Sequence, residues 1–493
     1  MSESERKARA DRLAALRAAG VDPYPAQVGP LVRLAEVRRR HDGDDEAALE
    51  AAAPQVAVAG RVLAIRSFGK LVFMTLVEDG VSLQASFRKP ELEPAVLTLL
   101  TLVDVGDFVR VEGVLWRTRT GELTVNARAL AVVAKCLHPL PEKWHGLVDV
   151  EARYRQRYLD LLVNPEARAI AVKRSRAITA LRAFLDGRDF LEVETPVLQP
   201  LYGGANATPF LTHYDVYDTN VYLRISDELY LKRLVIGGLD RVYEIGHNFR
   251  NEGVSRKHNP EFTVMECYQA YADFRDMMEL VQAMLLQIVT TVTGGTRITY
   301  REQELEFSGE WPRLAIRDGI LERCGVDVLA AADFAALRAR VLEKGLDAGD
   351  APTWGQLVDH LFSEHVEPTL VQPTFVTDYP VELSPLAKRS GTDPRLVERF
   401  ELFIGGMELA NAFSELNDPE DQRGRFEEQR IAKAAGDAET QPLDEDFLLA
   451  MEHGMPPTGG LGVGIDRVVM LLCNAAHLRE VLLFPYMRAG SES

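Results

Sequence analysis

The chain has 493 residues, of which 46% are hydrophobic and 26% charged, and its formal net charge is −18. This length exceeds what one hydrophobic core supports, so we expect two or three domains of a globular protein. The negative charge excludes nonspecific attraction to a polyanion, and any nucleic-acid contact must use local basic or aromatic surface.

The cysteines and the hydropathy of the chain indicate in which cellular compartment the protein resides. The four cysteines are scattered without a CxxC pair, which argues against a zinc site and is typical of reduced thiols in the cytosol. The N-terminus lacks an apolar signal core, and no apolar run is long enough to span a bilayer. We therefore expect a cytoplasmic protein without a membrane segment.

Residues 1–54 form a predicted N-terminal helical extension. Residues 1–20 follow an amphipathic helical pattern that stops at Gly20, and residues 41–54 are acidic and rich in alanine. This composition is typical of a peripheral helix or loop.

Residues 55–138 form the next predicted domain. Five short strand patterns with turn signals between them, and a helical interruption near 91–103, predict a small Greek-key barrel of the oligonucleotide-binding type. Such a barrel binds single strands by stacking bases on exposed aromatic rings. The candidate residues are Arg66, Phe73, Gln84 and Glu122. The alternative is that Phe73 belongs to the core, as most phenylalanines on strands do.

Residues 139–150 form a predicted linker, and residues 151–493 form a second domain with a helical insertion at about 273–365. The second domain begins with a long helical pattern and then a strand that ends at Pro196. A later helix begins with Ser226 as its expected N-cap.

A predicted hairpin, with strands at 241–250 and 261–270, is the centre of the second domain. Both strands are rich in β-branched and aromatic residues, and the loop between them has turn residues. On the second strand the residues of one parity combine an aromatic ring, a carboxylate and a phenol, whereas a core face is aliphatic. These residues are Phe262, Val264, Glu266 and Tyr268.

The loop of this hairpin concentrates cationic and hydrogen-bonding side chains. Arg250, Arg256, Lys257 and His258 are donors suited to a polyphosphate. The alternative is a solvated hairpin with charges at its tip.

A second hairpin is predicted at Gly405-Gly406. A two-residue turn places Phe403 opposite Glu408, and Glu401 shares the face of Phe403. The two carboxylates then converge, and such a pair of hard oxygen ligands suits Mg²⁺. Asn411, Phe413 and Glu415 alternate along the strand, and their parity differs from that of Glu408. A bulge near 409–410 is therefore needed for these residues and Glu408 to face one cavity. The alternative is a pair of surface glutamates.

The third cluster lies in GMPPTGGLGVGIDR, at residues 454–467. Its glycines permit close approach of a ligand to the backbone, and Arg467 follows where the strand enters a helix. No second βαβ unit supports a dinucleotide-binding fold.

These clusters resemble a known family. FRNEGVSRKHNPEF is similar to the second class-defining motif of class II aminoacyl-tRNA synthetases, GLGVGIDR to the third, and FLEVETPVL to the first, which forms a dimer contact in that family. DELYLKRLVIGG, DYPVELSPLAKR and NAFSELND resemble bacterial-type lysyl-tRNA synthetases, as does the N-terminal barrel. The resemblance covers nearly the whole chain.

The resemblance implies an α+β fold, with a five-stranded OB-fold barrel before a catalytic domain built on an antiparallel β-sheet flanked by helices. It also implies a homodimer that uses L-lysine, ATP and tRNA(Lys), with Mg²⁺ as cofactor. Such enzymes form lysyl-adenylate and pyrophosphate, then transfer the lysyl group to the 3′ end of the tRNA. Catalysis then depends on positioning and charge neutralisation, because the substrate carboxylate is itself the nucleophile.

Residue roles follow from the same resemblance. Arg250 would bridge the lysine carboxylate and the α-phosphate, and Phe262 and Arg467 would enclose the adenine, whose edge Glu252 reads. His258 and Asn259 would lie near the phosphates, and Glu401 and Glu408 would hold Mg²⁺. For lysine itself, the implied contacts are Glu415 and Tyr268 at the ε-ammonium, Glu228 and Gly204 at the α-ammonium, and Glu266, Asn411 and Phe413 along the pocket.

In the barrel, the resemblance implies that Phe73 and Gln84 stack on and read the central uracil of the anticodon, with Arg66 and Glu122 nearby. Two departures from the family pattern occur: Thr208 replaces a usual basic residue, and Ser226-Asp227 replaces Ala-Pro. We expect neither departure to touch a residue of the proposed chemistry.

Three alternatives are open. An aspartyl or asparaginyl enzyme has the same layout, but Glu228 and Glu415 would repel an acidic substrate. A truncated paralogue that lysylates a translation factor would lack the barrel. A catalytically silent RNA-binding protein would not need the complete set of Arg250, Glu401, Glu408 and Arg467. Lysine-dependent ATP–pyrophosphate exchange distinguishes these possibilities.

Overall fold

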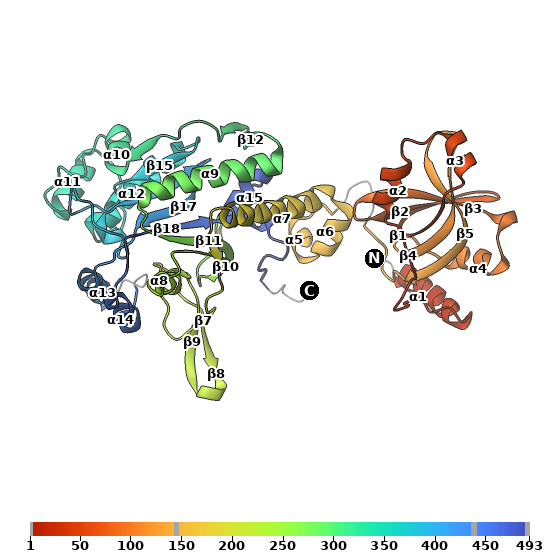
Figure 1. The fold of residues 1–493 in the computed structure, drawn as a ribbon, viewed down its shortest axis with the longest axis horizontal. Coiled ribbons are helices and arrows are strands. Elements are labelled where there is room, and N and C mark those ends of the chain that lie inside the picture. The colour runs from red at the N-terminus through yellow and green to blue at the C-terminus, as the bar shows by residue number, and fades with distance from the viewer. Residues whose placement is uncertain (1–2, 142–146, 435–440, 489–493) are drawn as a thin grey trace. The chain divides into compact units, whose positions relative to one another are not determined.

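The computed structural model describes residues 3–141, 147–434 and 441–488 (Figure 1). The chain separates into two compact units, one comprising Met1–Val148 with Tyr158–Pro165 and the other Asp149–Arg157 with Glu166–Ser493. Part of the predicted linker, including Trp144, lies outside the described residues. The exact domain boundaries drawn from the sequence stay predictions.

The first unit contains a closed five-stranded barrel in the order β1-β2-β3-β5-β4. Alternate side chains of its strands point inward and form one aliphatic core. The predicted barrel and its helical interruption are confirmed. The elements are α1 (Glu3–Ala18), α2 (Leu34–His41), α3 (Glu46–Ala52), β1 (Gln55–Phe68), β2 (Leu71–Glu78), β3 (Val81–Arg88), α4 (Pro94–Leu102), β4 (Phe108–Arg117) and β5 (Leu123–Ala134).

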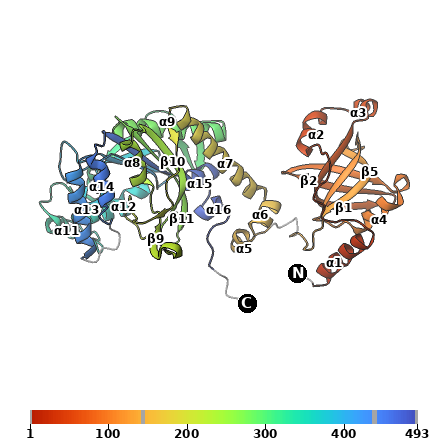
Figure 2. The same cartoon turned by 60° about the horizontal axis from the view of Figure 1, so that its bottom comes forward.

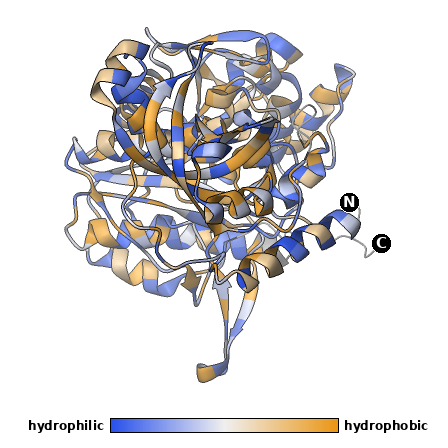
Figure 3. Ribbon diagram, turned by 90° about the vertical axis from the view of Figure 1, so that its right-hand side faces the viewer, coloured by the Kyte–Doolittle hydropathy of each residue, from blue (hydrophilic) through white to orange (hydrophobic). Residues whose placement is uncertain are grey.

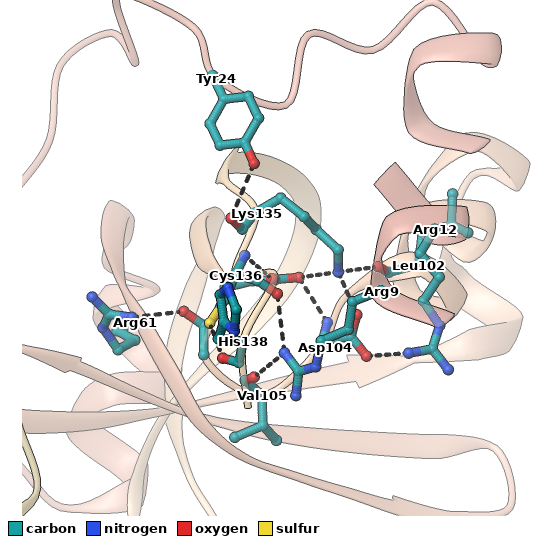
Figure 4. Close-up of polar contacts among 12 residues, drawn as sticks. Arg9, Arg12, Tyr24, Arg61, Leu102, Asp104, Val105, Lys135, Cys136 and His138 are labelled. Carbon is teal, nitrogen blue, oxygen red and sulfur yellow. Dashed lines mark hydrogen bonds and ion pairs between the residues drawn. The ribbon is translucent and has the colours of Figure 1, made fainter. Parts of the chain in front are cut away.

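Helix α1 is attached to the barrel through two arginines (Figure 4). Arg9 Nη1 donates to the carbonyl oxygens of Val105 at 2.9 Å and Cys136 at 3.1 Å. Arg12 forms an ion pair with Asp104. The predicted N-terminal helix therefore belongs to the same compact unit as the barrel.

The second unit is built on an eight-stranded sheet in the order β14-β15-β16-β17-β18-β11-β10-β6. Its inner pairs are antiparallel, and the β14–β15 and β10–β6 pairs at the two edges are parallel. Helices α7, α9 and α15 pack on one face and form the largest apolar core with it (Figures 1 and 2). The chain therefore has the predicted α+β architecture, on a sheet that is mixed at its edges.

The strands of this sheet come from distant parts of the chain. They are β6 (Leu191–Glu192), β10 (Arg241–Phe249), β11 (Glu261–Ala270), β14 (Arg313–Ala315), β15 (Thr374–Thr377), β16 (Arg399–Ile404), β17 (Met407–Ser414) and β18 (Thr458–Gly464). A separate three-stranded sheet contains β7 (Leu198–Gln199), β8 (Leu211–Tyr214) and β9 (Thr219–Leu223), and β12 (Arg297–Tyr300) pairs with β13 (Gln303–Glu306). Strands β12–β14 thus interrupt the stretch predicted to be a helical insertion.

The remaining helices are α5 (Val150–Arg155), α6 (Arg157–Val163), α7 (Pro165–Asp186), α8 (Glu228–Ile236), α9 (Phe274–Thr293), α10 (Ile316–Cys324), α11 (Phe334–Glu343), α12 (Trp354–His365), α13 (Pro419–Ala434), α14 (Glu445–Glu452), α15 (Ile465–Cys473) and α16 (Leu478–Val481). Within the described ranges, none of the helices has both the length and the apolar character required to cross a bilayer.

Candidate active site

A cavity of about 430 Å³ opens on the side chains that the central strands direct away from the α7–α9–α15 core. It lies over β11, β16, β17 and β18 and is closed at one side by α8. Every residue that the family resemblance assigned to ATP or lysine lines this one cavity, whereas Arg256 of the hairpin loop does not. They are Gly204, Glu228, Arg250, Glu252, His258, Asn259, Phe262, Glu266, Tyr268, Glu401, Glu408, Asn411, Phe413, Glu415 and Arg467.

The first predicted hairpin is confirmed as the antiparallel pair β10–β11. On β11, Phe262, Val264, Glu266 and Tyr268 face the cavity, whereas Met265 and Cys267 enter the apolar core. The alternation of the strand thus separates the chemical face from the packing face.

Arg250 follows β10 and its guanidinium carbon lies 5.1 Å from the centre of the Phe262 ring. Its Nε is buried without a hydrogen-bond partner, and burial lowers its pKa. A buried guanidinium with a free donor is a site for an anionic ligand.

Arg467, in the first turn of α15, is held against β17. Its Nη1 donates to Glu408 O at 2.5 Å and to Glu408 Oε2 at 3.1 Å. Its Nη2 lies 3.3 Å from His258 Nε2. Burial lowers the pKa of His258, and Arg467 and Lys257 lower it further. This end of the cavity therefore favours anions.

The second predicted hairpin is confirmed at Gly405 and Gly406, which have φ of +63° and +68°. A two-residue type I′ turn requires a positive φ at both of its central residues. Phe403 pairs with Glu408, as predicted. Because Leu402 pairs with Ala410, one residue is unpaired, and the predicted bulge near 409–410 is present. The bulge changes the parity of β17, so Asn411 and Phe413 face the same cavity as Glu408.

Glu401 and Glu408 bring two carboxylates to this cavity. Burial raises the pKa of Glu401 to about 7, although Arg399 opposes the shift and Tyr379 donates to its Oε2 at 2.9 Å. Among the described residues, no group of three or more acidic, histidine or cysteine side chains could hold a metal. Two hard carboxylate ligands fit one Mg²⁺ ion that takes its other ligands from phosphate and water.

The opposite end of the cavity is acidic and deeply buried. Ser226 Oγ donates to Glu266 Oε1 at 3.0 Å, and the Tyr268 hydroxyl donates to Glu266 Oε2 at 3.1 Å. Burial raises the pKa values of Glu228, Glu266 and Glu415. A cationic ligand would lower the cost of burying these carboxylates.

Two expectations about the start of α8 are wrong. The N-cap is Asp227, although the Ser226 hydroxyl still accepts from Glu228 N at 3.2 Å. The Ser226-Asp227 departure also touches the site, because Ser226 contacts Glu266. The helix begins one residue later than expected, at Glu228.

Two side chains that pair with glutamates of the cavity escaped the sequence analysis although local spacing carried a signal. Lys232 lies four residues after Glu228 on α8 and pairs with it. Arg399 lies two residues before Glu401 on β16 and so shares its face. Gln441, which accepts from Gly204 N at 3.2 Å, had no local signal.

On the barrel, the structure brings Arg66 and Phe73 into register across β1 and β2. The Phe73 ring lies 6.2 Å from the exposed Phe68 ring in edge-to-face geometry. Gln84 is largely buried, and its Nε2 donates to Thr124 Oγ1 at 3.4 Å. Glu122 pairs with Arg38 at 2.8 Å. Phe73 is thus partly exposed on the outer face, and the interpretation as core is wrong for it.

Comparison with known proteins identifies the family. Residues 149–488 match the family model of class II tRNA synthetases (D, K and N), and residues 56–133 match that of the OB-fold nucleic acid binding domain. The chain therefore belongs to the class II tRNA synthetases.

Its similar relatives carry one name. The lysine–tRNA ligase of Chloroflexus aurantiacus is 51% identical over 487 residues, which cover 98% of each chain. The lysine–tRNA ligase of Dehalococcoides mccartyi is 48% identical over 97% of this chain and 96% of its own. That of Roseiflexus castenholzii is 50% identical over 97% of both chains.

Proposed function

We propose that this chain is a lysine–tRNA ligase. It activates L-lysine with ATP to lysyl-adenylate and pyrophosphate, then transfers the lysyl group to the 3′ end of tRNA(Lys). The observation that carries the proposal is a single cavity that has three guanidinium groups and an acid pair at one end and a buried acidic slot at the other.

In the activation step, the lysine carboxylate attacks the α-phosphorus of ATP, and the bond to the pyrophosphate oxygen breaks. Arg250 neutralises the carboxylate and the α-phosphate as they approach, which its buried position and free Nε suit. Phe262 and Arg467 enclose the adenine, Glu252 reads its edge, and His258 and Asn259 lie near the phosphates. Glu401 and Glu408 would hold Mg²⁺, which would neutralise phosphate charge.

Selection of lysine depends on the acidic end. Glu415 and Tyr268 receive the ε-ammonium, Glu228 and the backbone at Gly204 receive the α-ammonium, and Glu266, Asn411 and Phe413 form the pocket between them. A neutral or acidic amino acid would leave buried carboxylates without a partner, which is costly. The acidic slot therefore disfavours the aspartyl and asparaginyl alternatives.

The barrel is proposed to bind the anticodon of the tRNA. Phe73 stacks on the central uracil and Gln84 reads its edge, with Arg66 and Glu122 beside them. Stacking and edge contacts depend less on net charge than phosphate contacts do, which suits a chain of net charge −18.

A homodimer in the cytoplasm is also proposed. The elements from β6 to β9 expose apolar side chains, and Val216 and Tyr217 at the end of the β8–β9 hairpin are 79% and 72% exposed. Figure 3 shows hydrophobic residues at the tip of this projecting hairpin. Exposed apolar patches of this kind are typical of interfaces. Light scattering is expected to give twice the chain mass of 54.9 kDa, and V216D/Y217D to shift the protein toward the monomer.

The direct test of the activity is ATP–pyrophosphate exchange with each amino acid in turn. Exchange is expected with lysine and not with aspartate or asparagine, and charging is expected for tRNA(Lys). Exchange that responds to aspartate or asparagine, or no exchange at all, would overturn the assignment.

A further inference from the structure

Lys232 reaches two carboxylates of the acidic slot that the proposed function reserves for the substrate. Its side chain is completely buried, and its Nζ lies 2.5 Å from Glu228 Oε1. The same nitrogen forms a second ion pair with Glu415 Oε2 and lies 5.5 Å from the centre of the Phe413 ring. One ammonium thus joins the carboxylate assigned to the α-ammonium of lysine to the carboxylate assigned to its ε-ammonium.

The surrounding groups explain why an ammonium is needed here. Asp227 and Glu228 reach the slot from the start of α8, and Glu266 and Tyr268 reach it from β11. Glu415 directly follows β17, and the positive charge of Arg399 on β16 opposes the rise that burial causes in the pKa of Glu228. Glu228 and Glu415 both pair with the same nitrogen, and two buried carboxylates at such close range cannot both stay ionised without a cation. Without the Lys232 ammonium, the two would share a proton.

The slot still offers an acceptor for a second ammonium. Glu415 Oε1 is buried and has no hydrogen-bond partner. It lies against Gly460, where an added side chain would overlap it. Lys232 therefore compensates one negative charge and leaves an acceptor of the same glutamate free for a ligand.

We infer that Lys232 is a positioning residue, whose ammonium serves as a resident counter-ion that keeps Glu228 and Glu415 ionised and correctly spaced before lysine arrives. Lysine then binds without first displacing a proton from this pair. The inference rests on the proposed function, because it assumes that the ligand of the cavity is lysine.

Replacement of the ammonium by an apolar chain tests the idea. In Lys232→Met the two glutamates share a proton in the empty slot, and the incoming lysine must expel it. Calorimetry of lysine binding at pH 7 in buffers of different ionisation enthalpy is expected to show about one more proton released than in the wild type. Lys344→Met, at an exposed lysine after α11, is the matched control and should behave as the wild type.

Kinetics provide a second readout. Because binding to Lys232→Met releases an extra proton, its KM for lysine should fall about tenfold more per pH unit than that of the wild type as pH rises. The KM for ATP should show no such added slope. A purely structural role of Lys232 would change kcat or stability without adding a pH slope confined to lysine.

The outcomes separate the two hypotheses. Lysine binding with equal proton release in Lys232→Met and the wild type would overturn the role of Lys232 alone. Absence of lysine binding and exchange in the wild type would overturn the proposed function. If Lys232→Met does not fold, Lys232→Gln replaces it: release of more protons than in the wild type supports the inference, and equal release overturns it.

Discussion

Glu401 and Glu408 face the same cavity, but their surroundings shift their pKa values in opposite directions. Burial raises the pKa of Glu401 to about 7. Burial also acts on Glu408, yet Arg467, Arg399 and Arg250 together lower its pKa below the ordinary value. One carboxylate of the pair is therefore ionised throughout the neutral range, and the other titrates within it.

This difference predicts a pH-dependent metal requirement. Because a proton and Mg²⁺ compete for Glu401, the Mg²⁺ concentration for half-maximal pyrophosphate exchange should fall roughly tenfold between pH 6 and pH 8. Exchange assays across Mg²⁺ concentration and pH measure this. In Glu401→Gln the residual activity should lose most of the pH slope, and an unchanged slope would contradict the prediction.

We expect discrimination for lysine to depend most on Glu415. Glu415→Gln removes the buried charge that faces the substrate side chain, so the KM for lysine should rise by about 100-fold or more, while that for ATP changes less than about threefold. Pyrophosphate-exchange kinetics measure both constants. Glu452→Gln, at the exposed end of α14, is the control. Equal changes for lysine and ATP would refute the assignment.

At the level of elements, β17 and β18 shape the cavity floor. The bulge in β17 directs both Glu408 and Asn411 into one space. On β18, which pairs with β11 and β17, the residue at Gly460 leaves room for the side chains of Glu415 and Tyr268. A backbone without side chains thus makes space for the acidic slot.

A methyl group at position 460 tests whether Gly460 makes space for the acidic slot. It would overlap Glu415 and approach Tyr268 Cε1 to 2.6 Å, so Gly460→Ala should raise the KM for lysine at least tenfold. Gly462→Ala, whose methyl would meet only ordinary contacts at 3.7 Å and beyond, should leave that constant within about threefold. Equal effects of the two variants on lysine would show that Gly460 serves only general packing.

At the scale of the whole molecule, recognition and chemistry belong to separate units. The barrel has its own apolar core, and every lining residue of the cavity belongs to the other unit. Changes on the outer face of the barrel should therefore act on tRNA and leave the chemistry of activation intact.

Phe73→Ala is the test of this separation. It should reduce the kcat/KM for tRNA charging by about 10-fold to 100-fold, because this is the effect of losing one stacked base. Lysine-dependent pyrophosphate exchange should change little. Both half-reactions are measured on one preparation, so exchange serves as the internal control. Equal loss in both would remove the barrel from recognition.

Local patterns determined much of this protein. Period-two alternation identified the β10–β11 hairpin and its chemical face, paired glycines identified the second hairpin, and the change of parity between Glu408 and Asn411 required the bulge that β17 contains. These features depend on neighbours within a few residues, so their physical cause is visible in the sequence.

Only the tertiary structure decided which distant groups meet. It places β18 between β11 and β17, brings Lys232 of α8 onto Glu415, and moves the N-cap from Ser226 to Asp227 while Ser226 contacts Glu266. The sequence could not show these contacts because they join segments up to nearly two hundred residues apart. Which partner a buried charge finds depends on how the sheet is assembled, since burial makes an unpaired charge too costly.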